Sequence, residues 1–228
     1  MEQAEPDVLC LQETKVADEL FPHAAFEQLG YRCAISGQKA YNGVAILSLL
    51  PLEDVQIGFE ALLPAEQEAA GLSEQKRVIS ALIDGIRVLN LYVPNGSSLK
   101  SEKYAYKLRW LACLRRYLEE QELQGEPLCM VGDFNIGPEA RDLPDPDRQT
   151  GGIMASEPER TALQAALNGR LTDVFRVFER GGRTINSQFP EIGLPNPSGS
   201  IQRLEEPGRP DLKQSNRGPG TGLRVAIP

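Results

Sequence analysis

Two apolar runs separated by a two-residue turn constrain the fold of this chain more than any other feature of its sequence. Residues 78–83 (VISALI) and 86–93 (IRVLNLYV) are rich in β-branched and apolar side chains, and only Asp84-Gly85 separates them. Asp-Gly is the typical central pair of a tight β-turn, so we expect an antiparallel β-hairpin. At least part of the sheet is then antiparallel, which argues against a doubly wound parallel fold.

Short apolar runs and longer amphipathic stretches alternate along the first 180 residues, as in a layered α/β domain. The other strands expected are residues 7–11, 31–36, 43–49 and 127–131, and the helices expected are residues 18–29, 101–123 and 157–168. The last 46 residues differ, because they hold seven of the 17 prolines, six glycines and one aromatic residue, with no sustained period. We therefore expect a domain over residues 1–182 and an irregular or disordered tail over residues 183–228.

The composition excludes several classes of protein. With 228 residues, 41% hydrophobic and 25% charged, the chain can bury one large core. No run approaches the roughly 20 apolar residues of a membrane span, and residues 1–6 do not resemble a signal peptide, so we expect a cytoplasmic monomer that binds no membrane. The formal charge of −8 argues against binding nucleic acid by bulk electrostatics alone, but it is compatible with a phosphate site bridged by a divalent cation. The four cysteines show no CxxC spacing and are interpreted as structural thiols.

Two of the expected strands are followed directly by carboxylates. Glu13 follows the first strand, where it could bind Mg²⁺, although an acid at a strand end is more often a solvated charge or a cap. Lys15 could pair with Glu13 or reach a phosphate. Asp133 and Asn135 follow the strand at 127–131 and share one face if the extended backbone continues. They could then orient an attacking water and a phosphoryl oxygen, or they could form an ordinary Asp/Asn turn.

A tyrosine and a group of lysines are further candidates. Tyr92 ends the hairpin before Pro94-Asn95-Gly96, and its hydroxyl could donate to a leaving oxygen, although a strand tyrosine is usually a packing residue. Asn42-Gly43 is most simply a turn that leads into a strand. The candidates for a local phosphate contact cluster near the loop after Tyr92, although a solvated helix face is the alternative; they are Lys100, Lys103 and Lys107.

Four segments, taken together and in order, resemble the exonuclease III family of the endonuclease/exonuclease/phosphatase superfamily. They are residues 6–15 (PDVLCLQETK), 41–48 (YNGVAILS), 90–96 (NLYVPNG) and 132–136 (GDFNI). The similarity continues through residues 156–160 (SEPER) and 171–176 (LTDVFR), so it covers about residues 5–180. The sequence of residues 42–44 and 92–96 resembles the DNA-repair branch of the superfamily more than its sphingomyelinase or inositol-phosphatase branches.

The resemblance implies a four-layer α/β sandwich, in which two packed mixed sheets are flanked by helices. It also implies a metal-dependent phosphodiesterase that cleaves duplex DNA at abasic sites and trims it 3′ to 5′ in base excision repair, with Mg²⁺ or Mn²⁺ as cofactor. Position by position, Glu13 matches the metal-binding glutamate, Tyr92 the active-site tyrosine, Asp133 the acid that prepares the water, and Asn135 its phosphate-orienting partner. Asp133 and Asn135 are also expected at the metal, and the implied substrate-binding residues are Lys15, Asn42, Asn95 and Lys103.

The sequence departs from the family at both ends. The family's first strand, which ends in a metal-site asparagine, and its terminal Ser-Asp-His have no counterpart here, and Ala226 stands where an aspartate is expected. The only histidine, His23, is interpreted as a surface or packing residue. We therefore expect the sandwich to be incomplete at both ends. A second function stays open, that of a catalytically inactive remnant that binds metal or DNA without hydrolysis.

Overall fold

The computed structural model describes residues 6–143 and 145–174, together with the backbone of residues 225–226. The strands are β1 (Val8–Gln12), β2 (Arg32–Ser36), β3 (Val44–Ser48), β4 (Glu53–Ile57), β5 (Val78–Ile83), β6 (Ile86–Tyr92), β7 (Leu128–Asp133) and β8 (Val225–Ala226). The α-helices are α1 (His23–Glu27), α2 (Gln67–Ser73), α3 (Glu102–Gln124), α4 (Pro146–Gln149) and α5 (Glu157–Leu167). Three short 3-10 turns are η1 (Asp18–Leu20), η2 (Phe59–Ala61) and η3 (Ala140–Asp142).

The strands form two mixed sheets. The first has the order β2-β3-β1-β8 and the second the order β4-β5-β6-β7. β6 runs parallel to β7, and β1 runs parallel to β8 over two residues, while the other pairs are antiparallel. The hairpin expected around Asp84-Gly85 is confirmed, because β5 pairs with β6 from Ile83 opposite Ile86 outward.

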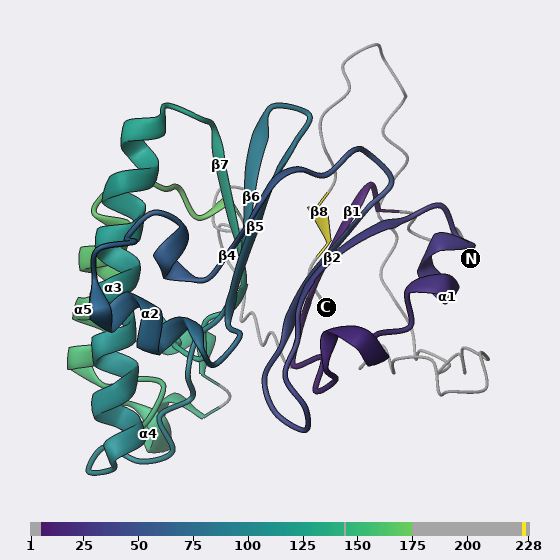
Figure 1. Cartoon of the computed structure of the whole chain (residues 1–228). Coiled ribbons are helices and arrows are strands. Elements are labelled where there is room, and N and C mark those ends of the chain that lie inside the picture. Colours follow the sequence, from purple (N-terminus) through teal and green to yellow (C-terminus); the bar gives the residue numbers. More distant parts are fainter. Residues whose placement is uncertain (1–5, 144, 175–224, 227–228) are drawn as a thin grey trace, which may run out of the picture.

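The two sheets pack face to face with helices on both outer sides (Figure 1). Strand β3 shows why, since all five of its residues are buried. Val44 and Ile46 face the second sheet, while Ala45 and Leu47 pack in the outer cluster with Phe26 of α1. A strand that is apolar on both faces must be covered on both faces. The expected four-layer α/β sandwich is thus confirmed.

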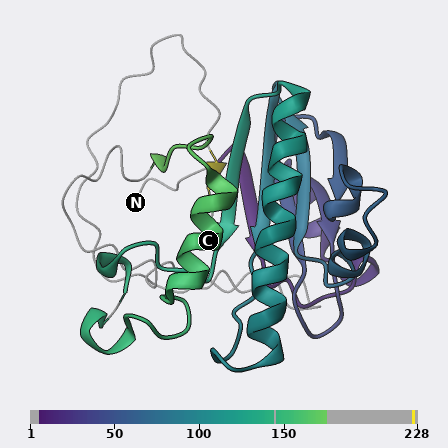
Figure 2. The same cartoon turned by 90° about the vertical axis from the view of Figure 1, so that its left-hand side faces the viewer.

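The other outer layer is built on α3. Ser101 caps its N-terminus by accepting a hydrogen bond from the Tyr104 N–H at 3.1 Å, and Gly125 ends it with a left-handed backbone. The ring of Trp110 is fully buried and meets Phe59 edge-on at 5.0 Å between ring centroids. Helix α5 lies beside α3 over the same sheet (Figure 2).

One predicted helix is wrong, and two elements of the structure were not predicted. The helix expected over residues 18–29 is replaced by η1 and the short α1, because Pro22 has no backbone N–H and keeps Phe21 extended. Strand β4 escapes prediction because its residues are mostly polar and exposed, and α2 because it has only seven residues.

Some of the other expectations are confirmed, and others concern residues that the structure does not describe. All four cysteines are free thiols, as predicted. No helix in the described part of the chain is both long and apolar enough to cross a membrane. The predicted tail at 183–228 lies outside the described residues except for β8.

Candidate active site

Three of the predicted site residues come from different strands and meet at one end of the sandwich. Tyr92 and Asp133 are register partners at the ends of the parallel strands β6 and β7. Glu13 follows β1 in the other sheet, and the Tyr92 hydroxyl donates a 2.7 Å hydrogen bond to its Oε1. A hydrogen bond therefore joins the two sheets at the end where the predicted site residues lie.

A buried asparagine sets this meeting of the two sheets. Asn90, on β6, donates from Nδ2 to the carbonyl oxygens of Leu11 and Ala45, both at 2.9 Å. Its Oδ1 accepts a 2.7 Å hydrogen bond from Gln12 Nε2. Because Gln12 directly precedes Glu13 and Asn90 lies two residues before Tyr92, these three bonds fix the register in which Glu13 and Tyr92 face each other.

Asp133 and Asn135 are joined by a turn and not by continuing strand. β7 ends at Asp133 and Asn135 has a φ of 50°, so the extended backbone that one shared strand face requires does not continue, and the alternative of an Asp/Asn turn holds. The Asn135 N–H donates to Asp133 Oδ1 at 2.9 Å, and Asn135 Nδ2 donates to Asp133 Oδ2 at 3.0 Å. Gly132, just before the turn, allows β7 to pack closely on β6, since its φ is 134° and a Cβ there would overlap the Leu91 carbonyl oxygen. The ordinary Asx turn that competed with the functional interpretation is itself what orients the carboxylate.

The predicted substrate-binding residues divide into two groups. Asn95 reaches the site, because its Nδ2 donates to Asn135 Oδ1 at 3.1 Å. Lys15 also reaches it, with Nζ 2.7 Å from Glu13 Oε2. Asn42 borders it through its carbonyl oxygen, which accepts from the Lys15 N–H at 2.9 Å, while its side chain bonds Gln38. Lys103 lies exposed on α3, and no hydrogen bond or ion pair joins it to the other site residues in the described part of the chain.

One prediction about the lysines is wrong. Lys107, expected near a phosphate, is fully buried, and its Nζ pairs with Glu159 Oε1 at 2.6 Å. The sequence interpretation grouped it with Lys100 and Lys103 near the loop after Tyr92, but a partner 52 residues away on α5 pairs with it in the interior. A lysine held in this way cannot contact a ligand directly.

The charges at the site shift the pKa values of its groups in opposite directions. Burial raises the pKa of Asp133, and the nearby negative charge of Glu13 adds to this, although the hydrogen bonds from Asn135 oppose it. Partial burial acts to raise the pKa of Glu13, but hydrogen bonds from Lys15 and Tyr92 outweigh it, so the pKa lies below the usual value. Burial, together with the bond to Glu13, raises the pKa of Tyr92. At neutral pH the site therefore has a protonated tyrosine and a carboxylate suited to accept a proton.

Sequence reasoning missed Arg77. Its guanidinium lies 4.5 Å from the centroid of the Tyr92 ring, and its Nη1 donates to the Tyr92 carbonyl oxygen at 3.2 Å. A cation over an aromatic face is attractive, so Arg77 holds the tyrosine ring in place. No sequence signal indicated this contact, since Arg77 only precedes β5. Asn90 did leave a signal, because it is a polar residue in the middle of an apolar strand.

The residues present fit a divalent cation. The two carboxylates, Glu13 and Asp133, lie close enough for the charge of one to raise the pKa of the other, which is the situation that a cation relieves. The described residues contain no group of three His, Cys, Asp or Glu side chains that could hold a metal alone. Mg²⁺ commonly uses one or two protein carboxylates and keeps waters or substrate phosphate oxygens as its other ligands.

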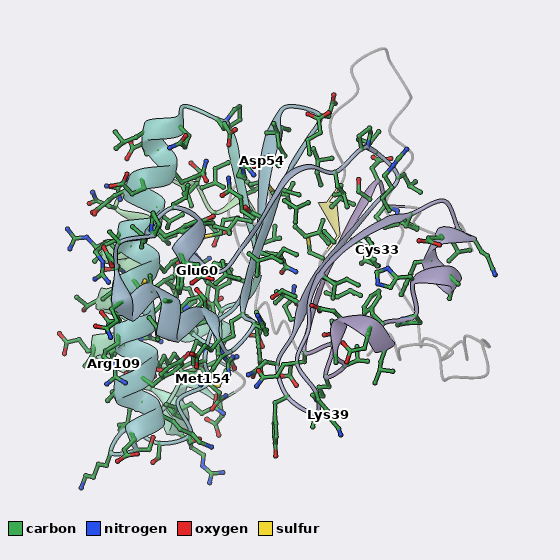
Figure 3. All side chains as sticks on the ribbon, viewed as in Figure 1. Cys33, Lys39, Asp54, Glu60, Arg109 and Met154 are labelled. Atoms are coloured by element: carbon green, nitrogen blue, oxygen red, sulfur yellow. The ribbon has the colours of Figure 1, made fainter. Side chains whose placement is uncertain are left out.

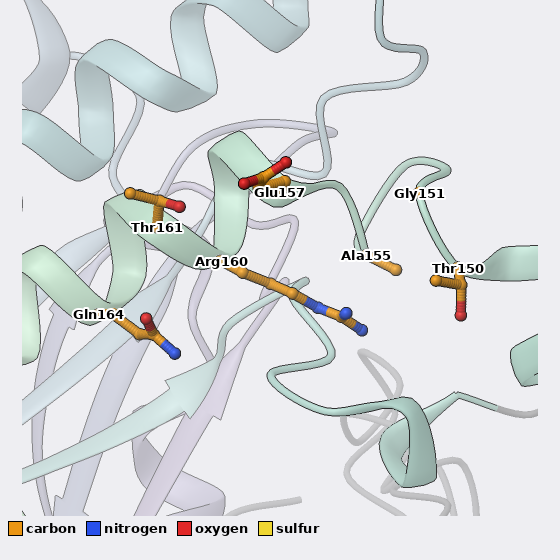
Figure 4. Close-up of a pocket in the computed structure, with 7 residues that line it drawn as sticks. All are labelled: Thr150, Gly151, Ala155, Glu157, Arg160, Thr161 and Gln164. Carbon is orange, nitrogen blue, oxygen red and sulfur yellow. The ribbon is translucent and has the colours of Figure 1, made fainter.

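A pocket among the described residues lies away from this site. It has a volume of about 380 Å³ and is lined by Thr150, Gly151, Ala155, Glu157, Arg160, Thr161 and Gln164. Figure 4 shows Arg160 reaching from α5 toward Thr150 and Gly151. None of the predicted site residues lines this pocket.

Comparison with known proteins defines the class of this chain. The sequence pattern of the endonuclease/exonuclease/phosphatase family matches residues 1–199, so the chain belongs to that family. Within the family it is 35% identical over 200 residues to exodeoxyribonuclease III of Haemophilus influenzae, a match covering 83% of this chain and 71% of the relative.

Solved structures agree with this assignment. An AP endonuclease from Archaeoglobus fulgidus is 36% identical with a TM-score of 0.72, covering 82% of this chain and 70% of that one. A 3′ phosphatase from Neisseria, solved with a product DNA hairpin, is 40% identical with a TM-score of 0.70, covering 78% of this chain and 66% of that one. The chain thus spans about two thirds of the length of these relatives. Its resemblance to exonuclease III and AP endonucleases is confirmed, and members of the family depend on a divalent metal ion.

Proposed function

We propose that this chain is a Mg²⁺-dependent DNA phosphodiesterase that incises duplex DNA at abasic sites and trims it from the 3′ end. The observation that carries the proposal is that two hydrogen-bonded pairs, Glu13–Tyr92 and Asp133–Asn135, are brought together by the pairing of Tyr92 with Asp133 in β6 and β7. The relatives support the reaction class, since they are named exodeoxyribonuclease III, AP endonuclease and 3′ phosphatase. A role in base excision repair, as a cytoplasmic monomer on duplex DNA, rests on the resemblance.

Asp133 is the proposed general base. Its raised pKa makes it a better proton acceptor than an ordinary aspartate, and two hydrogen bonds from Asn135 fix the direction of its oxygens. Water attacks phosphorus, the bond from phosphorus to the 3′ oxygen breaks, and Asp133 takes the proton of the water. The turn contributes to catalysis by letting Asn135 orient the Asp133 carboxylate, because a freely rotating carboxylate would rarely meet the water in line.

Tyr92 is the proposed donor to the departing 3′ oxygen. Its hydroxyl is protonated at neutral pH because burial and the Glu13 carboxylate raise its pKa. In the free chain this O–H bonds Glu13; turned to the departing oxygen, it would stabilise the developing negative charge and lower the barrier. Glu13 and Asp133, with the Asn135 amide oxygen, would hold the divalent cation, which when bound neutralises phosphate charge as a Lewis acid. Lys15 and Asn95, both at the exposed rim, are the proposed contacts to the other phosphate oxygens.

The inactive alternative has no support among these relatives, each of which is named for a catalytic activity. The described residues also include the proposed base, orienting amide and donor, which metal or DNA binding alone would not require. A cleavage assay can distinguish the two functions directly, because only an active enzyme produces new 3′ ends.

The test is a duplex oligonucleotide with one abasic-site analogue, labelled on the damaged strand and incubated with the full chain and Mg²⁺. We expect a single incision beside the analogue that requires the metal ion and is followed by 3′ shortening. The Asp133→Ala variant should give neither product. Product that persists unchanged in this variant would refute the site, and its absence from both proteins, with binding retained, would favour the inactive alternative.

A further inference from the structure

Lys107 is a buried cation whose bonding capacity is fully used. None of its surface is exposed, and its Nζ donates to Glu159 Oε1 at 2.6 Å, to the Asn135 carbonyl oxygen at 2.7 Å and to the Asn95 carbonyl oxygen at 3.3 Å. An ammonium group has three N–H donors, so each has one acceptor. Burying a lysine is costly, and two of the three bonds that offset the cost go to the backbone of residues whose side chains lie in the candidate site.

The acceptors belong to three separate segments. Asn95 lies in the loop after β6, Asn135 in the loop after β7, and Glu159 in the first turn of α5. Glu159 is equally buried, and its carboxylate also accepts from the Met154 and Ser156 N–H groups. The network therefore ties the two loops of the site to the helix that covers the second sheet.

The loop after β6 is shaped to receive this lysine. Gly96 has a φ of 93°, and a Cβ there would lie 3.3 Å from Lys107 Cδ and 3.0 Å from Ile153 Cδ1. A larger residue would push the loop away from the ammonium group. The loop is closed on its other side by Ser101, whose hydroxyl donates to the Gly96 carbonyl oxygen at 2.7 Å.

A second buried cation provides a comparison within the same sheet. Arg87 is 1% exposed and pairs with Asp54 at 2.6 Å and with Glu126 at 2.8 Å. It stands at the opposite end of β6 from Tyr92. Figure 3 shows Asp54 and Met154 at opposite ends of the second sheet, and Met154 is the residue whose Sδ lies 3.7 Å from Asn95 Nδ2. Arg87 thus matches Lys107 in its own burial and in its pairing with acids, although Asp54 and Glu126 are more exposed than Glu159; among the described residues no hydrogen bond or ion pair joins Arg87 to the site loops.

We infer that Lys107 is a positioning residue: its ammonium group clamps the carbonyl oxygens of Asn95 and Asn135 so that their side-chain amides line up on Asp133. The alignment is visible in the chain of bonds from Asn95 Nδ2 to Asn135 Oδ1 and from Asn135 Nδ2 to Asp133 Oδ2. Lys107 does not touch the substrate. The inference rests on the proposed function for its effect on turnover, but its effect on loop order is independent of any activity.

The first experiment compares Lys107→Met with Arg87→Met. Hydrogen exchange is measured by mass spectrometry on the full chain without metal or DNA, in the segments 94–101 and 134–138. Removing the clamp should speed exchange of these segments by about 10-fold or more, whereas Arg87→Met should leave them at the wild-type rate. Turnover of the abasic duplex by Lys107→Met should show a kcat lower by about 10- to 100-fold, as a small misplacement of reacting groups produces.

A double variant separates positioning from simple loss of stability. In Lys107→Met/Glu159→Gln neither charge of this pair remains, and replacing both partners of a buried pair is far less destabilising than removing one. Its Tm should therefore recover toward the wild-type value, while exchange of both loops stays fast and kcat stays low. Recovery of kcat along with Tm would overturn the inference, because the pair would then be structural only.

The remaining outcomes are also decisive. Unchanged exchange in the segments 94–101 and 134–138 of Lys107→Met would refute the clamp. An equal loss of kcat in Arg87→Met would refute it as well, because any buried cation would then have the same effect. If the wild-type chain cleaves no DNA, the proposed function fails, and the exchange rates alone still support or refute the clamp.

Discussion

Asp133 combines two properties that rarely occur in one aspartate. It is fixed by two hydrogen bonds from Asn135, and its pKa is raised by burial and by the charge of Glu13. Hydrogen bonds that favour the carboxylate normally lower a pKa, so the net rise shows that desolvation and the second carboxylate dominate. An acid held in this state is under electrostatic strain, which a bound cation or an accepted proton would relieve.

This strain gives a prediction for Asp133→Asn at pH 7 to 8. Because the folded pKa is raised, the ionised carboxylate destabilises the folded chain relative to the unfolded one, and this group's contribution improves as the pH falls. The neutral amide should therefore keep or raise Tm, while kcat falls by about 10²- to 10⁴-fold. Thermal melts and the abasic-duplex assay on the same preparation test this. A large drop in Tm together with lost activity would mean that Asp133 is needed for folding.

At the scale of the elements, the site depends on how the two sheets are held together. Most of the contact between them is apolar, and apolar side chains define a register only loosely. Besides the bond from Tyr92 to Glu13, directional contacts come from Asn90, which bonds the backbone of β1 and of β3 from its position on β6. This places Asn90 among the residues that determine where Glu13 lies.

Replacing Asn90 with Ala should lower the free energy of unfolding by about 2–4 kcal/mol, because buried carbonyl oxygens lose their donor and a cavity forms. The affinity for Mn²⁺ should also fall, since Glu13 loses its fixed position opposite Tyr92. Urea unfolding and Mn²⁺ titration are the measurements. Ser73→Ala is a matched control, because Ser73 is a buried hydroxyl that bonds Phe59 and Ala69 in the helical layer. Equal loss of Mn²⁺ affinity in both variants would contradict the account.

The distal ion pairs give a prediction about pH. Hydrogen bonds from Arg87 lower the pKa values of Asp54 and Glu126. Acids whose pKa is lower in the folded chain stabilise it at neutral pH, and this stabilisation is lost as the pH falls from above the ordinary carboxyl values through the lowered ones. Between about pH 6 and pH 3, Tm should therefore fall more steeply for the wild type than for Arg87→Met. Equal slopes of Tm against pH in the two proteins would show that these pairs contribute nothing to stability, which is the case for many exposed ion pairs.

At the scale of the whole molecule, the strand ends were predictable and the long-range contacts were not. The hairpin at Asp84-Gly85 and the end of β7 at Asp133 follow from local sequence, because turn residues and apolar runs act over a few positions. Lys107 was misjudged because its partner Glu159 is distant in the chain, although its spacing from Tyr104 and Leu111 places it on the buried face of α3. Arg77 was missed for the same reason.

The described sheets also have uneven edges. β1 pairs with β8 over only Val8 and Leu9, and β7 is the last strand of its sheet among the described residues, with most of its side chains partly exposed. Such edges are open to pairing with another strand. The expectation that the sandwich is incomplete at both ends stays a prediction, because the segments it concerns lie outside the described residues.

The most direct test of the account is the stoichiometry and affinity of Mn²⁺ binding to the full chain, measured by electron paramagnetic resonance. We expect one site per chain, and its affinity should fall at least about 10-fold in Glu13→Gln and also in Asp133→Asn. Glu13 and Asp133 meet only in the folded sandwich. Glu60→Gln, at an exposed acid on η2, should bind as the wild type does. Binding that is unchanged in Glu13→Gln and in Asp133→Asn would contradict the claim that these two carboxylates form one metal site.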